Sequence, residues 1–138
     1  MTSDLADLLD RVVAAAHEAG AAILAVSDTA AARGKADGSP VTEADTASEA
    51  VILAALAALT PGIPVVSEEQ VSEAGLPAVP EGRFWLVDPL DGTKEFIRRT
   101  GEYTVNIALV DDGRPVLGVV HAPALGLTYA GGPAGALM

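Results

Sequence analysis

Apolar residues first recur every three or four positions along this chain and later gather in short runs. Residues 5 to 26 place leucine, valine, isoleucine and alanine at helical spacing, which predicts a first helix. Residues 29 to 40 are polar and contain glycine, and the residue before Pro40 is expected to avoid helical geometry. The pattern therefore predicts a loop after the first helix.

A second helix is expected to begin at Thr42, which is a favourable N-cap residue. Asp45 follows three residues later, at a position that resembles a capping box. An apolar face continues to residue 59, and Thr-Pro-Gly at 60–62 is expected to end the helix. Asp45 thus has a structural explanation as a capping acid.

The second half of the chain predicts a sheet. Short apolar runs indicate strands over residues 63–66, 84–87, 104–110, 116–120 and 127–130. Asp-Asp-Gly-Arg at 111–114 predicts a hairpin turn, and residues 131–138 predict a turn and the start of a further strand. The fold class expected for residues 1–138 is one α+β domain, with two helices packed on a mainly antiparallel sheet.

Composition narrows the possible partners. The formal net charge of −11 argues against nucleic-acid binding through a basic surface. The chain has no cysteine, which excludes disulfides, thiolate metal sites and a cysteine nucleophile, and which fits a reducing, cytoplasmic setting. No apolar run is long enough to predict a transmembrane segment.

The candidate chemistry lies directly after the strand over residues 84–87. The sequence there is Asp-Pro-Leu-Asp-Gly-Thr, at positions 88–93. Pro89 fixes the backbone and Gly92 tolerates unusual dihedral angles, so Asp88 and Asp91 are expected on a rigid turn at the end of the strand. Carboxylates held in this way suit Mg²⁺. The alternative is that these residues only form a turn.

Further residues favour the metal site over a plain turn. Glu68 follows one predicted strand, and Asp88 and Asp91 follow another, so three carboxylates converge if the strands are neighbours. Thr93 adds a hydroxyl that a second acid could orient toward an attacking water. Other phosphate chemistries fit poorly, because the chain has no Gly-rich phosphate loop followed by lysine, and nothing places His17 near His121.

Three motifs, in order, resemble the signature of the inositol monophosphatase-like, lithium-sensitive, Mg²⁺-dependent phosphatases. They are Ser-Pro-Val-Thr-Glu-Ala-Asp at 39–45, Ser-Glu-Glu at 67–69 and Trp-Leu-Val-Asp-Pro-Leu-Asp-Gly-Thr at 85–93. Lys-Glu-Phe-Ile at 94–97 and Gly-Glu-Tyr-Thr-Val-Asn-Ile-Ala-Leu at 101–109 are similar to the 3'(2'),5'-bisphosphate nucleotidase branch. The inositol monophosphatase branch is the alternative. The resemblance covers nearly the whole chain from about residue 5 onward.

The resemblance implies a role for each matching residue. Glu68, Asp88, Asp91 and the carbonyl of Leu90 would bind Mg²⁺, and Glu68, Leu90, Asp91, Gly92 and Thr93 would border the substrate. Thr93 would activate the attacking water, with Asp45 accepting a hydrogen bond from its hydroxyl. The implied reaction releases the 3'-phosphate of adenosine 3',5'-bisphosphate and leaves AMP, a step used in sulfate assimilation. Lys94 could help attract the nucleotide.

The chain departs from the family in length. Family members carry a second, C-terminal α/β domain with another metal-binding aspartate, for which these 138 residues offer no equivalent. We therefore expect an N-terminal metal-site domain with weak or no activity on its own. The alternative is a non-catalytic remnant that folds, with a homo-oligomer as one way to cover an unfinished sheet edge.

Overall fold

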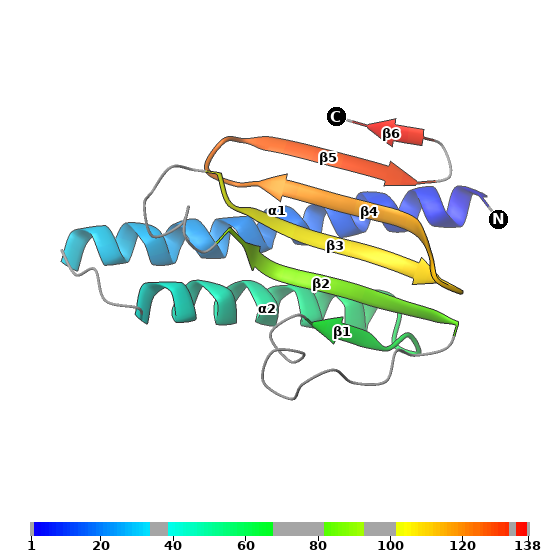
Figure 1. The fold of residues 1–138 in the computed structure, drawn as a ribbon, viewed down its shortest axis with the longest axis horizontal. Coiled ribbons are helices and arrows are strands. Elements are labelled where there is room, and N and C mark those ends of the chain that lie inside the picture. Colours follow the sequence, from blue (N-terminus) through cyan, green and yellow to red (C-terminus); the bar gives the residue numbers. More distant parts are fainter. Residues whose placement is uncertain (1, 34–38, 68–81, 93–101, 133–134, 138) are drawn as a thin grey trace.

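The computed structural model describes residues 2–33, 39–67, 82–92, 102–132 and 135–137. It contains two helices and a six-stranded sheet, and both helices lie against the same face of that sheet (Figure 1). Within the described residues, no helix is both long and apolar enough to cross a membrane. The predicted α+β arrangement is confirmed.

Both helices are longer than the sequence pattern predicts. The first, α1, spans Thr2–Arg33, so the expected loop is wrong over residues 29–33. Three of these five residues are alanine, the residue with the highest helix propensity, which explains why the helix continues beyond residue 26. Residues 34–38, the middle of the expected loop, lie outside the described residues.

The second helix, α2, spans Ser39–Leu59 and begins three residues before the predicted N-cap at Thr42. Pro40 is its second residue, where the missing N–H costs nothing because first-turn amides have no partner within the helix. Asp45 therefore lies in the second turn, and its expected capping position is wrong.

The sheet has the strand order β1-β2-β3-β4-β5-β6, with neighbours in sequence also neighbours in space. The strands are β1 (Val65–Ser67), β2 (Arg83–Asp91), β3 (Thr104–Asp111), β4 (Arg114–Ala122), β5 (Leu127–Gly132) and β6 (Gly135–Leu137). Only the β1–β2 pair is parallel among these described strands, and the other four pairs are antiparallel. The predicted mainly antiparallel sheet is confirmed, including a strand after residue 131.

The turn between β3 and β4 is the predicted hairpin. Asp111 pairs with Arg114, and the two residues between them, Asp112 and Gly113, have φ angles of 51° and 80°. Positive φ at both central positions fits a type I′ turn, whose twist matches that of the flanking strands. This hairpin brings the far end of β4 to the same edge of the sheet as the end of β2 where the candidate site lies, with β3 between the two strands (Figure 1).

The core lies between the helices and one face of the sheet. Trp85 and Val87 of β2 point into it, together with apolar residues of α1, α2, β3 and β4. The indole N–H of Trp85 donates to the Thr60 hydroxyl across 2.9 Å, so its polar atom is paired within the core. The opposite face carries exposed apolar side chains, namely Leu86, Val120, Leu127 and Tyr129.

Candidate functional site

The Asp-Pro-Leu-Asp segment continues β2 instead of forming a turn after it. The strand runs to Asp91, which corrects the expectation that it ends at residue 87. The pairing with β3 shifts within this segment, because Asp88 pairs with Asn106 whereas Asp91 pairs with Thr104. Three steps along β2 therefore match two steps along β3, which is a β-bulge. Pro89 is accommodated there because a bulged residue does not have to donate to the ladder.

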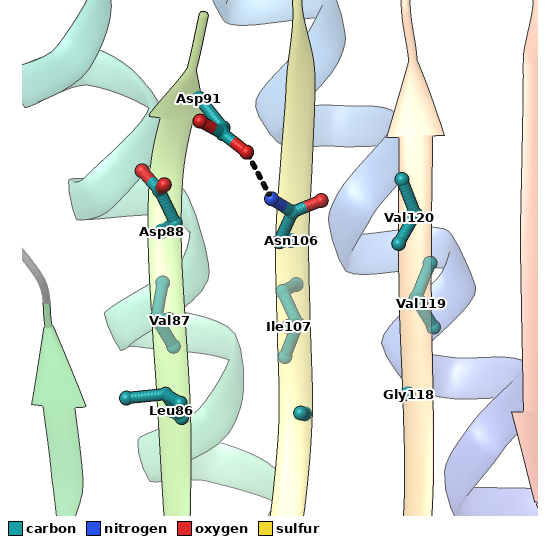
Figure 2. Close-up of a pocket in the computed structure, with 10 residues that line it drawn as sticks. Leu86, Val87, Asp88, Asp91, Asn106, Ile107, Gly118, Val119 and Val120 are labelled. Carbon is teal, nitrogen blue, oxygen red and sulfur yellow. Dashed lines mark hydrogen bonds between the residues drawn. The ribbon is translucent and has the colours of Figure 1, made fainter.

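The bulge brings both carboxylates to one face of the sheet. In a regular strand, residues three apart point to opposite faces, since side chains alternate. The extra residue of the bulge interrupts this alternation, so that Pro89 and Leu90 are both buried on the helix side. Asp88 and Asp91 therefore point to the opposite face, where Asp88 is half-buried and Asp91 exposed. Figure 2 shows Asp88 and Asp91 on the side of the sheet away from the helices.

Asn106 on β3 lies opposite Asp88 in register and contacts Asp91. Its side-chain Nδ2 donates to Oδ2 of Asp91 across 3.1 Å (Figure 2). Asp88, Asp91 and Asn106 lie at one end of a shallow groove on the open face of the sheet. Apolar residues and Gly118 line the rest of that groove. Asn106 was not identified from the sequence as a candidate site residue, although it is a polar residue within an apolar strand.

Helix α2 supports the bulge from the core side. The hydroxyl of Ser48, which is fully buried, donates to the carbonyl oxygen of Pro89 across 2.7 Å. Asp45 lies one turn earlier on the same helix and is 9% exposed. Spacings of three and four residues place helical side chains on one face. Asp45 and Ser48 therefore share the side of α2 that faces β2.

A second contact joins α2 to the end of β1. The Ser67 hydroxyl donates to a carboxylate oxygen of Glu49 across 2.6 Å. Because β1 and β2 are parallel and Ser67 pairs with Val87, the two strands end at the same edge of the sheet. The assumption that these strands are neighbours is therefore confirmed. Neither Ser48 nor Glu49 was identified from the sequence, because both are unremarkable within a helix.

Some of the predicted site residues lie outside the described residues. These are Glu68, which follows Ser67 in sequence, Thr93 and Lys94. Gly92 is described, and its φ of 93° confirms that this position requires a conformation favourable only to glycine. An added Cβ at Gly92 would lie 3.2 Å from the carbonyl oxygen of Glu102, so the approach of the two chain segments is also close.

The described residues fit part of a Mg²⁺ site. Among them, no three acidic or histidine side chains gather within reach of one metal ion. Asp88 and Asp91 nevertheless offer hard oxygen ligands from one face of the sheet, and the side chain of Leu90 is buried in the core. Two carboxylates side by side also favour a bound cation.

The two histidines lie together, which contradicts the expectation that nothing brings them near each other. The ring centroids of His17 and His121 are 4.5 Å apart. His17 Nε2 and His121 Nδ1 lie 2.9 Å and 2.8 Å from the hydroxyl of Thr128. The cause is the topology: α1 crosses β4 and β5, where His121 and Thr128 are paired in register. They lie on the helix side of the sheet, away from Asp88 and Asp91.

Burial lowers the pKa of His121, and the nearby His17 lowers it further. A hydrogen bond to the carbonyl of Leu127, 3.2 Å from Nδ1, partly opposes this shift. The neutral form of His121 is therefore favoured in the folded chain.

The fold and these motifs belong to a recognised class of proteins. The model of the inositol monophosphatase family matches residues 4–135, and the chain belongs to that family. Solved structures of inositol monophosphatases have the same fold, which agrees with the family match. The inositol monophosphatase from Anabaena superposes over 98% of this chain and 46% of its own, with a TM-score of 0.76 and 29% identity.

Within the family, the chain is similar to 3'(2'),5'-bisphosphate nucleotidases named CysQ. It is 55% identical over 126 residues to that of Salmonella typhimurium and 49% identical over 134 residues to that of Escherichia coli K12. These matches cover 88% and 89% of this chain but only 50% and 51% of the relatives. CysQ from Bacteroides thetaiotaomicron superposes with a TM-score of 0.75 and 36% identity over 94% of this chain and 48% of its own. The chain thus spans about half the length of these relatives.

Proposed function

We propose that this chain carries the first half of a Mg²⁺-dependent phosphatase site that removes the 3'-phosphate of adenosine 3',5'-bisphosphate. The observation that carries the proposal is the bulge in β2, which places Asp88 and Asp91 on one face of the sheet. A plain turn-forming role for the segment does not explain a bulge supported from the core by Ser48. Sensitivity to lithium, a cytoplasmic setting and use in sulfur assimilation belong to the same proposal.

The residues that would hold Mg²⁺ are Glu68, Asp88, Asp91 and the carbonyl of Leu90. Asp88 and Asp91 have the oxygen chemistry and the shared orientation that this ion needs. The end of β1, directly before Glu68, lies beside β2 in parallel register. When bound, Mg²⁺ would lower the pKa of water and offset the charge of the phosphate.

The proton chemistry would fall to Asp45 and Thr93. The carboxylate of Asp45 would accept a hydrogen bond from the Thr93 hydroxyl, and that hydroxyl would orient the attacking water. The position of Asp45 on α2, one turn before Ser48, supports this role because it directs the acid toward β2. Water would add to phosphorus as the bond to the ribose 3'-oxygen breaks, giving AMP and phosphate. Gly92 and Thr93 would border the phosphate.

Sequence identity favours the nucleotidase branch over the inositol phosphate branch. The fold does not separate them, since the TM-scores to the CysQ and inositol monophosphatase structures are 0.75 and 0.76. Sequence identity separates the two branches. The CysQ relatives from Salmonella and Escherichia are 55% and 49% identical to this chain, whereas the Anabaena inositol monophosphatase is 29% identical.

The test compares two substrates with and without Mg²⁺. Phosphate release is measured from adenosine 3',5'-bisphosphate and from inositol 1-phosphate, using the chain at high concentration because a low rate is expected of it. The variants are Asp91→Asn and, as a matched control, Asp112→Asn, which changes an exposed acid in the β3–β4 turn. We expect Mg²⁺-dependent release that prefers the bisphosphate, falls at least tenfold in Asp91→Asn and persists in Asp112→Asn.

Two results would contradict the proposal in different ways. A preference for inositol 1-phosphate would contradict the nucleotidase assignment and leave the phosphatase class intact. Absence of Mg²⁺-dependent release from both substrates would favour the non-catalytic remnant instead.

A further inference from the structure

Asn106 interrupts an apolar strand at the point where β3 meets the acidic pair. Its neighbours Val105 and Ile107 are almost fully buried on the helix side, whereas Asn106 faces the groove. It is paired in register with Asp88 and donates a hydrogen bond to Asp91. Asn106 therefore lies opposite Asp88 and is hydrogen-bonded to Asp91.

The orientation of the Asn106 amide is fixed by its partner. A carboxylate only accepts hydrogen bonds, so Nδ2 of Asn106 must face Asp91 and Oδ1 must turn away. Figure 2 shows Oδ1 pointing toward the side of β4. This oxygen is buried, and it has no hydrogen-bond partner among the described residues. A buried acceptor without a partner costs stability, and asparagine is also unfavourable within strands.

We propose that Asn106 is a positioning residue that holds the Asp91 carboxylate for Mg²⁺, at a cost to the stability of the chain. The bond to Oδ2 restricts the rotation of Asp91 and leaves Oδ1 of Asp91 to a ligand. A neutral donor suits this task, since lysine or arginine would repel the cation and a third acid would repel the other two. The inference rests on the proposed function.

The test uses Mg²⁺ binding and thermal stability instead of activity. The chain contains one asparagine and one glutamine, Gln70, so a ¹⁵N spectrum shows only two side-chain carboxamides and that of Asn106 is readily assigned. Mg²⁺ is titrated into wild type, Asn106→Val and a matched control, Arg83→Gln. Arg83 makes a comparable 3.1 Å bond to Asp111 across the same two strands, at their opposite end.

In wild type, we expect the Asn106 carboxamide signal and the backbone signals of Asp88 and Asp91 to shift with one common Mg²⁺ midpoint. Asn106→Val should bind Mg²⁺ about tenfold more weakly, the lower end of the effect of removing such partners of metal ligands. Its thermal midpoint should be equal to that of wild type or higher. Arg83→Gln should bind Mg²⁺ as wild type does.

The contrary results separate this inference from the proposed function. Wild-type affinity in Asn106→Val would overturn the positioning role alone. Loss of the fold in Asn106→Val would show that Asn106 is structural, and would also overturn it. Absence of Mg²⁺ binding by wild type would overturn the metal site itself, and the role of Asn106 with it.

Discussion

The Ser48 hydroxyl donates to the carbonyl of Pro89 across 2.7 Å, and this bond joins the second helix to the bulge in β2. Bulges leave backbone groups outside the regular ladder, and a buried carbonyl without a partner is costly. Ser48 thus satisfies the group that the bulge releases. The orientation of Asp88 and Asp91 consequently depends on a helix residue about forty positions earlier in the chain.

Replacing Ser48 with alanine should destabilise the chain. The Pro89 carbonyl would be left buried without its partner, which costs about 1–3 kcal/mol. The higher helix propensity of alanine would return about 0.5 kcal/mol, so the loss dominates. Urea unfolding followed by the fluorescence of Trp85, the single and fully buried tryptophan, measures the change. Thr46→Ala, at an exposed position of the same helix, is the control and should raise stability slightly, because it gains helix propensity without losing a buried hydrogen bond.

Gly92 should tolerate alanine less well than Gly113 does. Both have positive φ, 93° and 80°, so each substitution should cost on the order of 1 kcal/mol in backbone strain. Only at Gly92 would the new Cβ also crowd another segment, 3.2 Å from the Glu102 carbonyl. Urea unfolding of the two variants isolates the effect of this close approach. Equal losses of stability would show that Glu102 can move aside.

Much of the fold follows from local sequence signals. The Asp112-Gly113 turn was predictable because only certain residues accept positive φ at both central positions. The start of α2 was not predictable in this way. A proline suggests a helix boundary, whereas Pro40 lies in the first turn of α2, where a proline is accepted. Proline also suggested that β2 ends at residue 87. Pro89 instead lies in a bulge, and only the pairing with β3 distinguishes a bulge from a turn.

The acidic residues of the candidate site could be predicted from the sequence, but the residues that hold them in place could not. Asp88 and Asp91 are marked by the turn-forming residues around them. Ser48 and Asn106 act across long sequence separations, and neither the helix pattern nor the strand pattern indicates a partner for them. The contact between His17 and His121 is of the same kind, because the crossing of α1 over β4 creates it.

Acid should destabilise the chain through His121. Its pKa is lowered by burial and by His17, so unfolding takes up a proton once the pH falls below about 6.5, the value expected for an unfolded histidine. The stability that the neutral ring contributes is therefore complete above that pH and is lost as the pH falls toward the lowered pKa. Urea unfolding between pH 7.5 and 5 should show this decline.

His17→Gln is the informative variant for the histidine pair. His17 is exposed, so the substitution should leave the fold intact while removing the charge that opposes protonation of His121. The decline in stability between pH 7.5 and 5 should then be smaller than in wild type. An unchanged decline would show that burial alone sets the pKa of His121.

Gly20→Ala tests whether packing outweighs helix propensity in α1. Alanine in a helix interior is favoured over glycine by about 1 kcal/mol. At Gly20, however, the new Cβ would lie 2.8 Å from Cδ2 of His121 and 2.9 Å from Cβ of Pro123, so the ring or the strand end must shift. Overpacking of this kind costs about 1–3 kcal/mol, and we expect a net loss of stability in urea unfolding. Gly62→Ala is the control because its Cβ would meet nothing within 4 Å, and it should be neutral or slightly stabilising. A gain of stability in Gly20→Ala would mean that His121 moves at little cost, in which case its contacts with Thr128 contribute little to the fold.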